Sequence, residues 1–161
     1  MLNLSSLPLA RSRSYPWILL TLTTALFVAA CFLPAATIGD YGGGALSEGP
    51  VEHHTDSGLS CLLFGWLAFP NSLPGWSANW VLFAGMCFAG AGNWACAARS
   101  GLLATALSVS VPFSFSGDSF HAGYYLWVGS CAILGVGSLV GWRVRGRAVS
   151  VPSQTTPVAD P

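Results

Sequence analysis

The chain has 161 residues, of which 53% are hydrophobic and only 7% charged, and its formal net charge is zero. A soluble domain carries about 25% charged residues, so this composition excludes an ordinary soluble fold and indicates a lipid-facing surface. The chain also lacks the basic face that binding to nucleic acid requires, so no nucleic-acid partner is expected.

The first apolar segment, residues 17–36, follows an N-terminal segment, residues 1–16, that carries Arg11 and Arg13. A helix that crosses a bilayer needs about 20 mostly apolar residues, and this uncharged segment is long enough. Cytoplasmic loops hold an excess of arginine and lysine. The pattern therefore predicts a first crossing that is preceded by a cytoplasmic N-terminal segment.

An alternative is that this segment is cleaved as a secretory signal. It has a basic start and an apolar centre, and the letters VAAC resemble the lipid-attachment motif of bacterial lipoproteins, with Cys31 as the lipidated residue. However, Phe32, Leu33 and Pro34 continue the apolar run beyond the cysteine. Because the apolar part of a signal normally ends at its cleavage site, this continuation favours an uncleaved helix.

The second apolar run, LSCLLFGWLAF at residues 59–69, is about half as long as a crossing requires. It predicts a re-entrant or interfacial helix. Three later segments predict further crossings, at residues 78–97, 100–116 and 122–142. Pro112 interrupts one of them, and a proline is tolerated in a membrane helix where another group satisfies the carbonyl that it frees.

The arginines decide between four and five crossings. If residues 59–69 stay on the outer side, all six arginines fall on one side of the membrane. If those residues cross, the three arginines after residue 142 oppose the two at the N-terminus. The rule that positive charge stays inside favours the first arrangement.

The sequence therefore predicts an all-α fold, an integral membrane bundle over residues 17–142 with four transmembrane helices plus the short helix at 59–69. Both termini are predicted to be cytoplasmic. Residues 143–161 contain many Pro, Ser and Thr residues after the arginines, and they predict a disordered cytoplasmic tail.

Three histidines fall on the predicted outer face and are the candidate metal ligands, namely His53, His54 and His121. Imidazole is a competent ligand for zinc and related metals. Adjacent histidines in an extended chain point to opposite faces, and their spacing matches no zinc motif. A solvated polar loop is therefore the favoured interpretation, and no cofactor is expected.

The five cysteines include no close pair of the kind that thiol–disulfide enzymes use. Cys31 and Cys61 both approach the predicted outer face, where an oxidising compartment would allow a structural disulfide. The predicted crossings contain no Asp, Glu, Lys, Arg or His. This composition argues against a proton-coupled pump, because intramembrane ionisable residues usually mark proton and ion paths.

Small residues are spaced for close helix packing. Gly85, Ala89 and Asn93 recur every four residues in segment 78–97, and Gly137 and Gly141 form a GxxxG pattern in the last segment. Such stripes let membrane helices approach closely, and an asparagine can bond across helices. The pattern is equally consistent with packing inside one chain and with formation of a homo-oligomer.

The segments LLFGWLAF, WSANWVLFAG and HAGYYLWVGSCAILGVGSL resemble a group of small, uncharacterised bacterial membrane proteins. The likeness covers residues 58–140. It rests on Gly65-Trp66, on Asn79-Trp80, where Trp80 replaces the usual proline, and on the GYYLW letters at 123–127. The resemblance implies four helices and a bacterial inner membrane, and it implies no activity.

Three functions fit these features. The favoured one is a non-enzymatic accessory or structural subunit, whose partners are the lipid bilayer and another membrane protein or further copies of the chain. The second is a transporter of small molecules or lipids, or an oligomeric pore. The third is a metal-dependent enzyme that uses the three histidines on the outer face.

Overall fold

The computed structural model describes residues 14–39, 53–64, 73–114 and 119–149 of the chain. Most of these residues are helical. The elements in chain order are α1 (Tyr15–Phe32), β1 (Pro34–Gly39), β2 (His53–Ser57), α2 (Gly58–Phe64), α3 (Leu73–Gly90), α4 (Trp94–Ser114), β3 (Ser119–Phe120) and α5 (Ala122–Val149).

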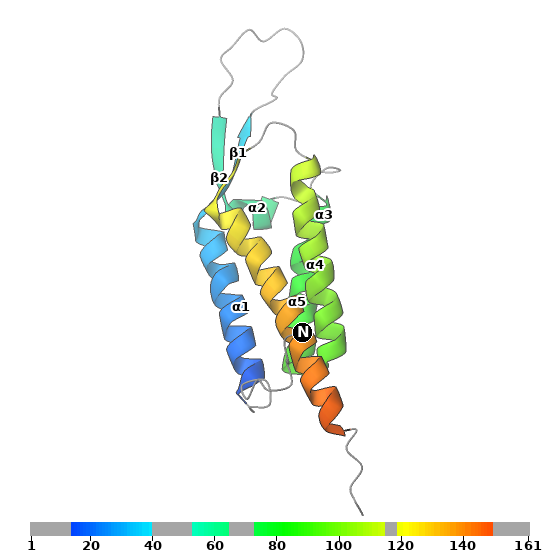
Figure 1. Ribbon diagram of the computed structural model, residues 1–161. Helices are drawn as coiled ribbons and strands as arrows, with labels where there is room; N and C mark the ends of the chain where they lie inside the picture. The colour runs from blue at the N-terminus through cyan, green and yellow to red at the C-terminus, as the bar shows by residue number, and fades with distance from the viewer. Residues whose placement is uncertain (1–13, 40–52, 65–72, 115–118, 150–161) are drawn as a thin grey trace, which may run out of the picture.

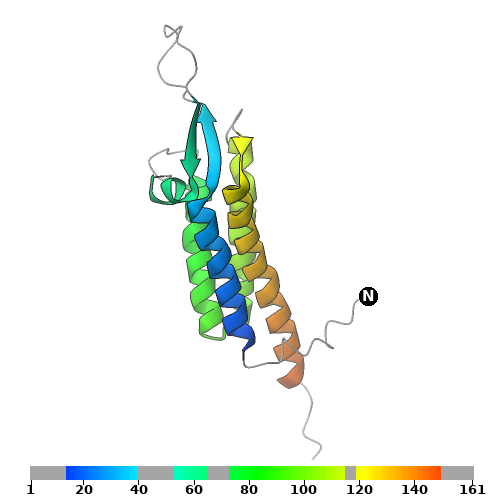
Figure 2. The same cartoon turned by 90° about the vertical axis from the view of Figure 1, so that its left-hand side faces the viewer.

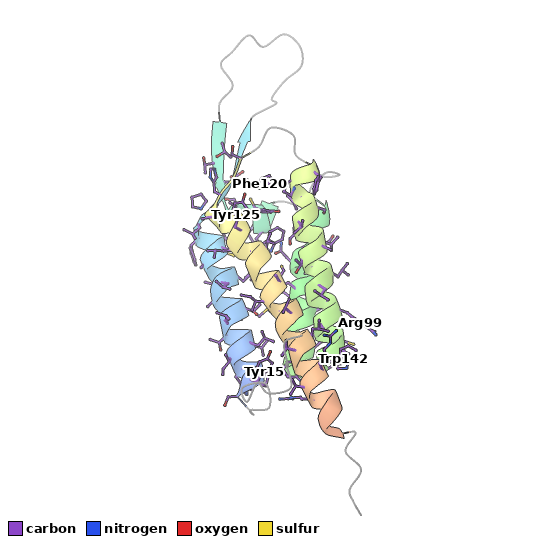
Figure 3. All side chains as sticks on the ribbon, in the orientation of Figure 1. Tyr15, Arg99, Phe120, Tyr125 and Trp142 are labelled. Carbon is purple, nitrogen blue, oxygen red and sulfur yellow. The ribbon has the colours of Figure 1, made fainter. Side chains whose placement is uncertain are left out.

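The four long helices α1, α3, α4 and α5 lie side by side along one axis, and the strands gather at one end of this bundle (Figure 1; Figure 2). We refer to that end, which carries β1, β2 and β3, as the sheet end. The opposite end carries Arg99 of α4 and Trp142 of α5 (Figure 3). Arg143 and Arg145 follow Trp142 on α5, and we call this end the arginine end.

A small antiparallel sheet corrects the prediction of an all-α fold. Its strand order is β2-β1-β3, so the central strand comes from the segment after α1. The residues paired across the sheet include Pro34–Ser57, Thr37–Thr55, Ile38–His54, Gly39–His53, Ala36–Phe120 and Thr37–Ser119. The sequence hides this sheet because β3 is only two residues long and its partner strand lies far away along the chain.

α1 ends at Phe32, earlier than the predicted boundary at residue 36. Leu33 has φ −96° and ψ 155°, which is an extended conformation. A residue before proline is disfavoured in the helical region, because the proline ring clashes with its backbone. Pro34 therefore ends the helix and starts β1.

The turn between α3 and α4 falls inside the segment 78–97 that was predicted as one helix. Gly92 has φ +77°, in the left-handed region that favours glycine. Asn93 Oδ1 accepts a hydrogen bond from the Cys96 amide at 3.3 Å and so caps α4. The boundary is wrong because no charge marks this turn, whereas the letters GAGN do mark it.

The remaining helix boundaries also differ from the prediction. α4 begins at Trp94 and replaces the predicted segment 100–116, so Arg99 is an exposed residue within a helix and not part of a loop. α5 continues to Val149, past the predicted end at residue 142. The first part of the predicted tail is therefore helical, and residues 150–161 lie outside the described residues.

α2 lies across the end of the bundle instead of along it (Figure 1). Ser57 Oγ accepts a hydrogen bond from the Ser60 amide at 3.2 Å, which caps the start of the helix. Leu59 and Leu63, one turn apart, are both exposed. The rest of the predicted run 59–69 lies outside the part of the chain that the structure describes.

Three of the described helices are long and apolar enough to cross a membrane, namely α1, α4 and α5. Large apolar side chains lie on their outer surfaces, including Trp17, Phe32 and Phe113, whereas Leu82 and Leu134 are fully buried in the core. A soluble protein seldom exposes so much apolar surface. These helices are therefore compatible with a membrane protein.

Candidate functional site

The three candidate metal ligands lie on both sides of the central strand. His53 and His54 belong to β2, opposite Gly39 and Ile38 of β1. His121 follows β3, which pairs with the other edge of β1, and its amide donates to the Ala35 carbonyl at 2.9 Å. Within the described residues, no three His, Cys, Asp or Glu side chains gather. Metal binding by these histidines therefore stays a prediction.

Hydroxyl groups connect His121 to the sheet. Its Nε2 lies 2.7 Å from Thr37 Oγ1, and the same hydroxyl lies 3.2 Å from Thr55 Oγ1. These contacts run from the start of α5, across the central strand, to β2. They give His121 a structural role in joining the last helix to the sheet.

Of Cys31 and Cys61, the two cysteines nearest the sheet end, Cys61 has the more strongly perturbed environment. Burial in α2, with a further contribution from the Asp56 carboxylate, raises the pKa of its thiol from 9.0 to about 11. A thiol with such a pKa stays protonated and is a weak nucleophile at neutral pH. Cys31 and Cys61 are both free thiols in this structure, and lipidation of Cys31 remains a prediction.

The GYYLW segment at the start of α5 connects three neighbouring elements. Its first residue, Gly123, lies against the end of α1. A Cβ at this position would lie 2.7 Å from the Pro34 carbonyl oxygen and 2.8 Å from that of Leu33. Gly58 of α2 approaches the same turn so closely that a Cβ would overlap the Ala30 carbonyl oxygen. Glycine is required at both positions because the backbones almost touch.

Tyr124 compensates for the proline inside α4. Pro112 has no amide hydrogen, so it cannot donate to the carbonyl of Ser108, four residues earlier. The buried Tyr124 hydroxyl donates to that carbonyl at 2.9 Å. The partner that the sequence requires for Pro112 thus comes from a different helix, and the bond fixes α5 against α4.

Trp127 fixes α5 against α3 in a similar way. Its indole Nε1 donates to Asn79 Oδ1 at 2.9 Å, and Asn79 is only 7% exposed. This bond joins two of the segments that carry the resemblance, WSANW and GYYLW. The neighbouring Trp80 is exposed and packs edge-on against Trp76.

The predicted packing residues have different surroundings. Gly85 lies where a Cβ would meet Leu134 at 2.9 Å, Gly137 lies against Leu19, and Gly141 lies against the Trp94 ring. Ala89 is fully buried in the core. The prediction for Asn93 is corrected. This residue is exposed in the turn before α4 and therefore lies outside the helix interface that was predicted for it.

The close approach between α4 and α5 was not predicted. A Cβ at Gly101 of α4 would overlap the backbone of Gly135 in α5, and a Cβ at Gly135 would lie 2.8 Å from the Leu102 amide nitrogen. Neither glycine belongs to the stripes that the sequence singles out. A facing pair of glycines is visible only when the register of the two helices is known.

Aromatic rings meet at the arginine end. The Tyr15 hydroxyl donates to the Gly137 carbonyl at 2.8 Å, and its ring centroid lies 5.7 Å from that of Trp94. The guanidinium carbon of Arg145 lies over the Trp94 ring, 4.8 Å from its centroid. α1, α4 and α5 are thus joined at this end by one stack of side chains.

No family model, curated protein or solved structure matches this chain. The resemblance to small bacterial membrane proteins therefore stays a prediction that rests on the letters themselves. One of its motifs, Gly65-Trp66, lies outside the described residues.

Proposed function

We propose that the chain is a non-enzymatic protein of the bacterial inner membrane and serves as an accessory or structural subunit. The observation that carries this proposal is the exposed face of α1, where small residues and threonines lie on the surface of the bundle, whereas the glycines inside the bundle serve its own packing. Glycines close the gaps between its own helices, and the hydroxyls of Ser108 and Ser130 donate to carbonyls of their own helices. A transporter or pore receives less support, since these hydroxyls do not line a path.

The topology that accompanies this proposal has four crossings and two cytoplasmic termini. α3 is the fourth crossing, because a short turn connects it to α4 and the two helices pack together as an antiparallel hairpin. A helix that packs along a spanning helix lies at the same depth in the bilayer. The arginine end faces the cytoplasm, in line with the excess of positive charge on that side, and α2 lies at the outer interface.

Single-cysteine labelling tests this topology. Ala91 is exposed in the turn between α3 and α4, and Thr55 is exposed in β2. In a chain without other cysteines, we expect Thr55→Cys to react with a membrane-impermeant reagent from outside the cell and Ala91→Cys only after the inner face is opened. Labelling of both positions from the same side would contradict four crossings.

The proposed partner surface is the outer face of α1. A shallow, open groove runs along this helix, and its lining, which includes Trp17, Thr21, Thr24, Ala25 and Val28, comes from α1 alone. Small residues allow a second membrane helix to approach closely, and exposed threonine hydroxyls can bond across helices. A transmembrane helix of another protein fits a surface of this shape and chemistry.

Site-specific photo-crosslinking in native membranes tests the subunit proposal. A photoreactive residue replaces Thr24 in the groove, and the matched control replaces Val109, which is exposed on α4. We expect one stoichiometric adduct from position 24 and none from position 109. Recovery of the uncrosslinked chain alone from both positions, or the same adducts from both, would remove the proposal.

A further inference from the structure

The charges that the structure describes are divided between the two ends of the bundle. Arg99, Arg143 and Arg145 lie at the arginine end, and the one acidic residue among the described residues, Asp56, lies in β2 at the sheet end. The arginine end therefore carries positive charge with no described carboxylate beside it. Such a surface is complementary to an anion.

Arg145 is held in a fixed position at this end. The guanidinium carbon of Arg145 lies over the Trp94 ring, 4.8 Å from its centroid. Gly141 leaves room for that ring, and Tyr15 packs on it. A guanidinium that contacts a ring through its face can still bind a phosphate through two parallel in-plane N–H hydrogen bonds.

Aromatic side chains place the same end at the depth of lipid headgroups. Trp17 is 70% exposed and Trp142 is 47% exposed. Trp17 follows Tyr15 at the start of α1, and Tyr15 and Trp142 both lie toward the arginine end (Figure 3). Exposed tryptophan prefers the interface between the hydrocarbon and the water. An anion at this depth and beside these rings is most simply the headgroup of a phospholipid.

We propose that the arginine end binds an anionic phospholipid headgroup. Arg145, whose guanidinium lies over Trp94, supplies the paired hydrogen bonds to the phosphate, and Arg99 and Arg143 add positive charge to the same end of the bundle. This inference does not depend on the chain being a subunit of an assembly. It assigns a lipid class to one end of the bundle, namely lipids with a net negative headgroup.

Native mass spectrometry of the purified full chain in a neutral detergent tests the proposal. The two probes are phosphatidylglycerol and phosphatidylcholine with identical acyl chains, so that only the headgroup charge differs. We expect tighter binding of phosphatidylglycerol, and a loss of about fivefold in its affinity in Arg145→Gln, since one arginine near a membrane surface contributes an effect of that order. Equal binding of the two lipids would overturn the proposal.

Two further variants separate a specific site from net charge. Asp56→Asn changes the net charge by one unit in the opposite direction at the sheet end, so an effect of net charge alone would raise the affinity for phosphatidylglycerol, whereas we expect it to stay unchanged. Arg145→Lys keeps the charge but loses the planar fork, so its affinity should fall partway, and it serves as the test if Arg145→Gln does not fold. A response to Asp56→Asn as large as that to Arg145→Gln, or unchanged binding in Arg145→Lys, would sink the assignment.

Discussion

The sheet-side half of α5, residues 122–130, and its arginine-side half, residues 131–145, meet the same three helices through different kinds of contact. Near the sheet, Gly123, Tyr124 and Trp127 contact α1, α4 and α3 in turn, and the last two do so through side-chain hydrogen bonds, of which the Tyr124 bond is buried and the Trp127 bond partly buried. Toward the arginines, Gly135 and Gly141 admit α4 and Gly137 admits Leu19 of α1, while the hydrogen bond from Tyr15 ends on the Gly137 main-chain carbonyl.

The two kinds of contact have different effects on how α5 packs. A hydrogen bond between a buried donor and acceptor is directional and costly to leave unmade, so the sheet-side half selects one register of the helices. A glycine contact carries little direction but sets how closely two backbones approach. The arginine-side half therefore determines packing distance, and substitutions in the two halves should fail in different ways.

Gly135→Val is expected to have the largest effect. A Cβ at this position would lie within 3 Å of main-chain atoms of Leu102 and Gly101, which cannot move aside as a flexible side chain can. Overpacking of this kind costs about 3 kcal/mol or more when backbone has to shift. The loss of stability is measured as the change in the free energy of unfolding in detergent, monitored through the helical circular dichroism signal.

Gly129→Ala is the matched control on the same helix. A Cβ there meets no atom within 4 Å, and alanine is a better helix former than glycine by roughly 0.5–1 kcal/mol. We expect unchanged or slightly higher stability. Equal losses in Gly129→Ala and Gly135→Val would show that the close approach between α4 and α5 is not the cause.

Trp127→Phe should have an intermediate effect in the sheet-side half. The substitution leaves Asn79 Oδ1 buried without its donor, at a cost of about 1–2 kcal/mol. Combining it with Asn79→Leu removes both polar partners, so the double variant should be more stable than the sum of the single losses predicts. Strict additivity in this double-mutant cycle, measured by chemical unfolding, would contradict the hydrogen bond.

Tyr124→Phe should cost about 1 kcal/mol, because the Ser108 carbonyl then loses the donor that replaces the missing amide of Pro112. In a Pro112→Ala chain the main-chain amide returns and can donate to the same carbonyl. The Tyr124→Phe substitution should therefore cost less in that background. Thermal unfolding of the four variants tests this, and an equal cost in both backgrounds counts against the compensation.

The smallest effect concerns Cys61, whose pKa is raised to about 11. The folded chain keeps this proton while an unfolded thiol releases it above pH 9.0, so stability falls as the pH rises from 9.0 toward 11. At pH 8 the thiolate fraction should be about a hundredfold below that of an ordinary cysteine. The rate of alkylation at Cys61, measured by peptide mass spectrometry, should rise in Asp56→Asn. An unchanged rate in this variant would contradict this account.

The sequence predicts the helical character of the chain well, because long uncharged segments carry a strong signal. It also predicts that Pro112 needs a substitute donor, although it cannot say that Tyr124 provides one. The turn at Gly92 and Asn93 is missed because the membrane pattern is read from charge, and no charge lies there. Contacts such as Gly101 with Gly135, and the pairing of β3 with β1, depend on residues far apart in sequence, so no local pattern reveals them.

The position of β1 between two strands has a consequence for biosynthesis. One edge of β1 can pair with β2 as soon as that hairpin leaves the ribosome, but the other edge waits for β3, which follows α4 along the chain. The sheet is therefore completed only after α4 has been synthesised, with α5 still to follow. A nascent chain arrested before residue 119 would expose one unpaired edge of β1 to proteases and to other chains.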